Sequence, residues 1–115
     1  MALLSEDAAT QERAVLTLMF LSADAANLHP LLKAGLHIPL MALLSEDAAT
    51  SRAKQAAAGV LDNLSRDANN IKPLSDAGLD KSLRLLLDDP NATILAKEYA
   101  TRALTYLSGS NAGSA

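Results

Sequence analysis

Apolar residues recur at helical spacing along most of this chain. The most regular stripe lies between residues 53 and 64, with steps of four, three, one and three positions, and the same steps return between residues 96 and 107. The first stripe comprises Ala53, Ala57, Val60, Leu61 and Leu64, and the second comprises Ala96, Ala100, Ala103, Leu104 and Leu107. A helix of 3.6 residues per turn carries such positions on one face. The pattern therefore predicts two long helices that bury these stripes.

Two shorter helices are predicted before each long one, and the first of them spans about residues 27–34 and again about residues 70–77. A proline in the opening turn of each costs no hydrogen bond, because the N–H groups there have no partner within the helix. A glycine ends each helix, since glycine accepts the left-handed conformation at low cost. The prolines are Pro30 and Pro73, and the glycines are Gly35 and Gly78.

The second short helix is predicted at about residues 38–44 and about residues 81–87, with leucines on one side. In the later copy, Asp88-Asp89-Pro90 follows it. Acidic residues favour a helix start, and proline is well placed at the first helical position. We therefore expect this tripeptide to end the second helix and begin the third.

These helices form a unit that occurs twice, because Asn27 and Asn70, like Leu61 and Leu104, lie 43 positions apart and no gap separates them. A fixed period of this size is typical of stacked repeat proteins, in which no unit buries its apolar faces alone. The predicted division is a partial repeat with second and third helices (1–26), two full repeats (27–69 and 70–108) and a flexible polar tail (109–115). The chain opens on a second-helix sequence and stops after a third helix, so both ends of the stack are expected to be open.

One segment departs from this period. The sequence MALLSEDAAT occurs at residues 1–10 and, letter for letter, at residues 41–50, which is an offset of 40. The stretch after the first copy, residues 11–22, is three residues shorter than residues 51–65. Two origins fit this observation, a recent duplication or an engineered chain.

The composition narrows the possible functions. The chain has 115 residues, half of them hydrophobic, and its aromatic residues are Phe20, Tyr99 and Tyr106, so its core must be built from leucine and alanine. A net charge of −3 with interspersed signs disfavours a nucleic-acid surface. There is no cysteine for disulfides or thiolate metal sites, no apolar run near the ~20 residues of a membrane span and no basic-then-apolar leader. We therefore expect a soluble, cytoplasmic protein.

The order of these elements resembles the armadillo repeat. Each unit has a short helix ending in Ala-Gly, a second helix ending in Leu-Leu and an acidic turn, and the middle unit closes its long helix with LDNLS at residues 61–65. The resemblance covers residues 27–108, and residues 1–22 look like a trailing part of a unit. It implies an all-α, right-handed α-solenoid of about two and a half three-helix repeats, in which the third helices line a concave groove.

The resemblance also implies candidate peptide-binding residues. An asparagine on the third helix clamps a peptide backbone in such proteins, and Asn63 matches it, while Phe20 and Tyr106 occupy the equivalent positions. A tryptophan one turn earlier is replaced by Leu16, Gly59 and Arg102. Two turns before the asparagine position lie Glu12, Gln55 and Glu98. The two glutamates would give the edge of the groove a mild negative charge, which would favour a basic peptide. Asn63 either contacts a ligand or binds water, and Gly59 either opens space for a ligand or lets a neighbouring helix approach.

The long helix of the first unit carries more apolar residues than its counterparts. Its expected core stripe is Ala14, Thr17, Leu18 and Leu21, and beside it lie Val15, Leu16, Met19 and Phe20. The repeat pattern leaves this second face in solvent, and contiguous apolar surface usually marks an interface. We therefore expect self-association through these four residues or through the open ends of the stack, most simply as a two-fold dimer. The alternative is that the terminal helices repack over this face within one chain.

No constellation of residues indicates catalysis. His29 and His37 fall on different predicted helices without a nucleophile or carboxylate motif around them, and we expect no metal or cofactor. The sequence thus favours a non-catalytic protein-interaction scaffold that associates with itself. The alternative is a module that binds an extended peptide in the groove of the third helices. Nucleic acid and membrane are not expected partners.

Overall fold

The computed structural model describes residues 7–46 and 49–113, with side chains up to Gly109. In these ranges the chain is all-α, as the sequence predicts, and the turns between its helices are short. The helices are α1 (Ala8–Ser22), the 3₁₀ helix η2 (Ala25–Asn27), α2 (Leu28–Lys33), α3 (His37–Leu44), α4 (Ser51–Leu64), α5 (Ala68–Asp76), α6 (Leu79–Leu87) and α7 (Ile94–Gly113).

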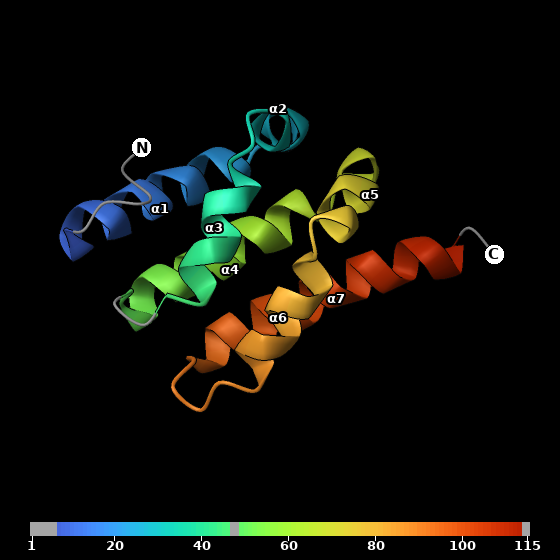
Figure 1. The fold of residues 1–115 in the computed structure, drawn as a ribbon. Helices are drawn as coiled ribbons and strands as arrows, with labels where there is room; N and C mark the ends of the chain where they lie inside the picture. Colours follow the sequence, from blue (N-terminus) through green and yellow to red (C-terminus); the bar gives the residue numbers. More distant parts are fainter. Residues whose placement is uncertain (1–6, 47–48, 114–115) are drawn as a thin grey trace.

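Three long helices, α1, α4 and α7, lie side by side with α4 in the middle (Figure 1). The most extensive contacts in the molecule are those of α4 with α1 on one side and with α7 on the other. The shorter helices α3 and α6 pack on α4 and α7 respectively, and α2 and α5 contact each other. The chain extends 44 × 30 × 20 Å along its principal axes.

The core is made of leucine and alanine, as the composition predicts. Every residue of the first predicted stripe is buried, and Ala100 and Ala103 of the second are fully buried. These alanines allow helix backbones to approach closely, while leucines such as Leu61 fill the remaining space. Leu104 is the exception in the second stripe: it is only half-buried and lines a shallow pocket with Leu87 on the outer side of α7.

Both glycines predicted to end the first short helices do so. Gly35 has φ 79° and Gly78 has φ 88°, in the left-handed region that strains other residues. Their N–H groups donate to the carbonyls of Leu32 and Ser75, which satisfies orphan acceptors in the last turns of α2 and α5.

Three predicted boundaries differ from the structure. Helix α5 begins at Ala68, because Asp67 caps it by accepting from the N–H of Asn69 at 2.9 Å, so Pro73 lies inside the helix and not in its opening turn. Helix α7 begins at Ile94 and not at Pro90, since Asp89 accepts from the N–H of Asn91 and forms a turn. The helix then continues to Gly113 through most of the predicted tail, where no proline interrupts it.

The repeated decapeptide adopts two structures where both copies are described. In the first copy Asp7 caps α1, and residues 8–10 form the opening turn. In the second copy Thr50 is itself the cap of α4, with its Oγ1 accepting from the N–H of Ala53 at 3.0 Å. The caps Asp7, Thr50 and Thr93 are therefore evenly spaced at 43 residues. Helix α1 thus includes residues 8–10, which compensate for the three residues that this unit lacks. Residues 1–6 and 47–48 lie outside the described ranges.

In the described part of the chain, no single helix is both long and apolar enough to cross a membrane. The segments Ala8–Ser22 and Ala25–Lys33 reach that length and apolarity only as a pair, and they are bent by 111°.

Candidate functional site

Hydrogen bonds at regular intervals join the three long helices. Thr50 Oγ1, at the start of α4, donates to Glu12 Oε1 of α1 at 3.0 Å. Thr93 Oγ1, just before α7, donates to Gln55 Oε1 of α4 at 2.8 Å. Donors and acceptors are each 43 residues apart, so the two bonds are equivalent. Gln55, a predicted groove residue, thus holds the neighbouring helix, while Glu98 at the next equivalent position is exposed.

Gly59 of α4 lies between side chains of α1 and α7. A Cβ atom at this residue would meet Met19 Cε at 2.6 Å and the Tyr99 ring at 3.2 Å. The first distance is shorter than real Cβ contacts, so a larger side chain would require the flexible end of Met19 to move, and the Tyr99 ring limits the space on the other side. This geometry agrees with the interpretation that the glycine permits helix approach, and it leaves no space there for a ligand.

An ion pair between an exposed arginine and a buried carboxylate also links α4 to α7. Arg102 Nη1 lies 3.4 Å from Asp62 Oδ2, and the Asp62 side chain is 1% exposed against 46% for Arg102. Burial raises the pKa of Asp62 above its ordinary value, while the positive charges of Arg102 and Arg66 act in the opposite direction. The guanidinium of Arg102 also lies 5.8 Å from the centre of the Tyr99 ring. Arg102, another predicted groove residue, is therefore engaged at the helix contact.

Asn63 has a structural partner. Its Nδ2 donates to Ser22 Oγ at the end of α1 at 3.0 Å, and Ser22 is buried. The amide that the resemblance assigns to a peptide backbone thus holds two helices together, which is neither of the two roles predicted for it. At the equivalent positions Phe20 is 82% exposed and Tyr106 is half-buried beside Arg66.

The predicted self-association face is largely an internal contact. Val15 is fully buried, and Leu16 and Met19 are half-buried against the core, so Phe20 alone of the four is well exposed. The predicted core stripe of α1 is confirmed at Leu18, which is buried, but is wrong at Thr17, which is exposed, and at Leu21, which is 45% exposed. The physical reason is that α1 turns another face toward α4. The buried residues of α1 are Gln11, Val15, Leu18 and Ser22, and Met19 lies against Gly59 of α4.

One face of α7, equivalent by the period of 43 residues to the face by which α4 contacts α7, is exposed. It consists of Ile94, Lys97, Glu98, Thr101, Arg102 and Thr105, which line a shallow pocket and are called the α7 end face below. These positions lie 43 residues after Ser51, Lys54, Gln55, Ala58, Gly59 and Asp62 of α4. Three of those α4 residues make the contacts with α7 described above. The α7 end face thus presents outward the helix positions that α4 uses to hold its neighbour.

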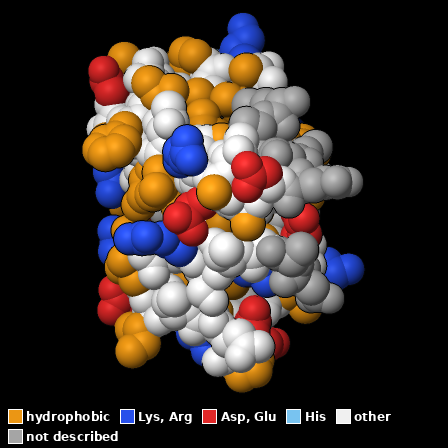
Figure 2. Space-filling model, turned by 90° about the vertical axis from the view of Figure 1, so that its left-hand side faces the viewer, with side chains coloured by type: hydrophobic (Ala, Val, Ile, Leu, Met, Phe, Trp, Pro, Cys, Tyr) orange, Lys and Arg blue, Asp and Glu red, His pale blue; other side chains and the backbone are white. Residues whose placement is uncertain are grey.

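The remaining surface is mixed. Figure 2 shows one side of the molecule, where hydrophobic side chains are interspersed with charges of both signs. Other large exposed apolar residues, Ile38 and Leu85, lie on α3 and α6. Neither forms part of a contact between the long helices.

Sequence reasoning missed a buried polar network around Asn70. Its Nδ2 donates to the carbonyls of Leu28 and Leu64 at 3.1 and 3.0 Å, and its Oδ1 lies 2.8 Å from Nδ1 of His29. The equivalent Asn27 donates to the carbonyl of Leu21 at 2.8 Å. The available signal was the pairing of the two asparagines at the period of 43, which marks a position that the fold uses twice.

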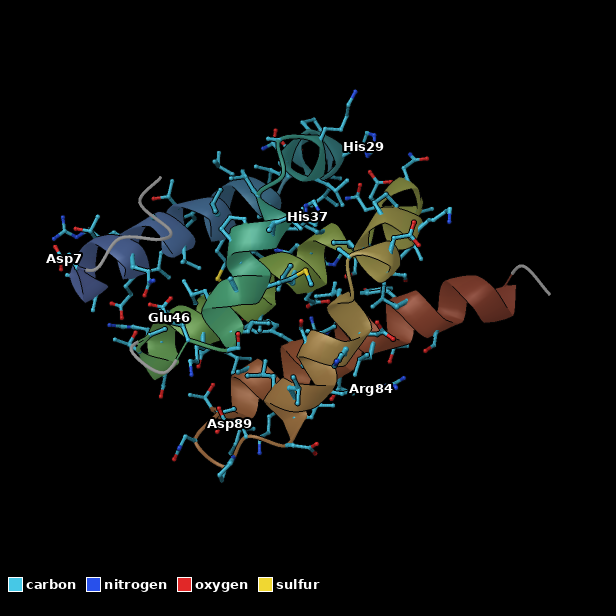
Figure 3. All side chains as sticks on the ribbon, viewed as in Figure 1. Asp7, His29, His37, Glu46, Arg84 and Asp89 are labelled. Atoms are coloured by element: carbon cyan, nitrogen blue, oxygen red, sulfur yellow. The ribbon has the colours of Figure 1, made fainter. Side chains whose placement is uncertain are left out.

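The two histidines lie on different helices. His29 is on α2 and His37 on α3 (Figure 3), and burial lowers the pKa of His37. Among the described residues, no group of three or more His, Cys, Asp or Glu side chains could hold a metal ion. No protein-family model, curated protein or solved structure matches this chain. Its function must therefore be inferred from its own contacts.

Proposed function

We propose that this chain is a non-catalytic protein-interaction scaffold that associates with itself. Its architecture is then an armadillo-like, right-handed α-solenoid of about two and a half repeats. The support for the repeat comes from the caps and hydrogen bonds that recur every 43 residues between the long helices. In such an array each unit is stabilised by its neighbours, so an exposed contact face favours association.

The single observation that carries the proposal is the exposure of the α7 end face. Gln55, Gly59 and Asp62 of α4 are covered by α7, whereas their counterparts Glu98, Arg102 and Thr105 are not. Ile94, on the same face, is 80% exposed. Of the apolar residues predicted for self-association, Phe20 remains available on the other side of the molecule.

Peptide binding in a groove is the weaker candidate. Its candidate contacts are engaged within the chain, since Asn63 binds Ser22 and Gln55 binds Thr93. The space beside Gly59 is occupied by the side chains of Met19 and Tyr99. A single clamp residue with its donor in use offers little to an extended backbone, which needs several binding positions along its length.

The proposal is tested by the solution mass of the chain across micromolar to millimolar concentrations, measured by sedimentation equilibrium. We expect the mean mass to rise with concentration toward that of an assembly. A strictly monomeric chain over the whole range would contradict the proposal. Titration with a basic extended peptide addresses the weaker candidate, and we expect no binding at micromolar concentration.

A further inference from the structure

The α7 end face carries charges of both signs at one-turn spacing. Glu98 and Arg102 are four residues apart, about 6 Å along the helix axis, and Thr101 lies between them on the same face. No hydrogen bond or ion pair within the described chain engages the carboxylate of Glu98. Arg102 binds Asp62 through Nη1, and a guanidinium has five N–H donors, so donors remain for a second carboxylate.

Continuation of the stack by a second copy would place like charges together. In this head-to-tail contact, α1 of the second copy would take the position that α7 holds against α4. Glu98 would face Asp7, because Asp7 is the cap equivalent to Thr93. Arg102 would face Arg13, which is equivalent to Tyr99 and is exposed. Juxtaposed like charges disfavour this head-to-tail arrangement, which would also leave a free end on every assembly.

A two-fold arrangement would place opposite charges together. If two α7 helices run antiparallel with the symmetry axis near Thr101, Glu98 of each copy lies opposite Arg102 of the other. Two complementary pairs then form at the centre of one interface. Ile94, two turns before Thr101, is covered at each edge by the far end of the partner helix. Such an interface uses the same surface on both molecules and closes at the dimer.

We propose that two copies of this chain pair through the α7 end face, with α7 antiparallel to its symmetry mate and Glu98 bound to Arg102 of the second copy. This inference depends on the self-association proposed above and specifies its surface, stoichiometry and symmetry.

Cysteine cross-linking tests the symmetry directly, because the chain contains no cysteine. Thr101→Cys places a thiol near the proposed axis, and Thr17→Cys on α1 is the matched control. Both threonines are exposed, and each donates to the carbonyl four residues earlier at 2.9 Å. Under mild oxidation we expect Thr101→Cys to form a disulfide dimer and Thr17→Cys to stay monomeric. An equimolar mixture of the two variants should give no mixed dimer.

The outcomes separate this inference from the proposed function. Disulfides between the Thr17→Cys and Thr101→Cys variants would establish the head-to-tail arrangement. They would overturn the two-fold pairing and leave self-association intact. An associating chain in which Thr101→Cys does not cross-link would place the interface elsewhere. A chain that stays monomeric in sedimentation would overturn both.

Charge reversal provides a second test. Glu98→Lys places a cation opposite Arg102 of the second copy, so we expect the dimer dissociation constant to rise about tenfold or more. Asp76→Lys, at an exposed ion pair with Lys72 on α5, is the control and should leave dimerisation unchanged. Added salt should weaken the unmodified dimer, since the central pairs are partly exposed. An unchanged dissociation constant in Glu98→Lys would contradict the proposed pairing.

Discussion

At the scale of single residues, the contacts between long helices decide what each side chain can do. Asn63 and Gln55 have the residue types expected in a peptide groove, yet Ser22 and Thr93 occupy their hydrogen-bonding groups. Asp62 is the extreme case, because the buried carboxylate has only Arg102 at 3.4 Å and no hydrogen bond to either oxygen. A charge so placed costs free energy that a neutral group of the same shape would not.

The pH dependence of the stability of the Asp62→Asn variant tests this cost. Burial raises the pKa of Asp62 in the folded chain above its ordinary 3.8, so the folded state holds the proton more tightly than the unfolded state. The stabilisation that comes from this tighter proton binding is fully present below pH 3.8, the ordinary pKa of an aspartate. It is lost as the pH rises through the pKa of Asp62 in the folded chain. We therefore expect the stability of Asp62→Asn relative to the unmodified chain to increase from acidic to neutral pH, measured by urea unfolding.

The exposed Asp88 supplies the control, because Asp88→Asn removes a charge of the same type at the surface. A pH-independent difference between Asp62→Asn and the unmodified chain would show that the folded and unfolded states hold this proton equally.

At the scale of elements, a cap sets each long helix in register with its neighbour. The letters Ala-Ala-Thr occur at the start of both α1 and α4, but Thr10 lies inside α1 whereas Thr50 caps α4. Thr50 accepts from the N–H of Ala53 and also donates to Glu12 of α1. The same letters thus take different positions in the two helices, and the second copy joins the start of α4 to its neighbour.

Thr93→Val tests the double role of a cap. The substitution removes the acceptor for the N–H of Ala96 and the donor to Gln55, so we expect a loss of about 2 kcal/mol in the free energy of unfolding. Thr93→Ser keeps both interactions and should restore most of this loss. Thr17→Val, at an exposed threonine, should change stability by less than about 0.5 kcal/mol. Urea denaturation measures all three, and equal effects of valine and serine would contradict the assignment.

At the scale of the whole molecule, the position of a long helix relative to the other two decides how much each equivalent residue contributes. Helix α4 is covered on both sides, whereas the α7 end face is open. Leu61 is accordingly fully buried, while its repeat counterpart Leu104 is half-buried.

Truncation of the two leucines measures this difference. We expect Leu61→Ala to lower the free energy of unfolding by about 2–5 kcal/mol, because it removes a fully buried side chain and leaves a cavity. Leu104→Ala should cost about half as much, since water already reaches part of the side chain. Thermal or urea unfolding at concentrations where the chain is monomeric gives both values. Equal losses would indicate that α4 and α7 have the same surroundings.

The sequence alone determined the features that depend on local chemistry and period. The stripe ending at Leu64 predicted the long helix, Gly35 and Gly78 predicted helix ends, and the composition predicted a leucine and alanine core. Each of these follows from backbone preferences or from the 3.6-residue turn, which act within a few positions.

The tertiary structure decided which face each helix turns inward and which residues remain free. Val15 is buried and Thr17 exposed because α1 packs against α4 through a face other than the one its repeat alignment suggests. Asn63 donates to Ser22 because the fold brings this residue, distant along the chain, beside it. Neither result could be read from spacing, since several faces of an apolar helix satisfy the same pattern and only the neighbouring helix selects one.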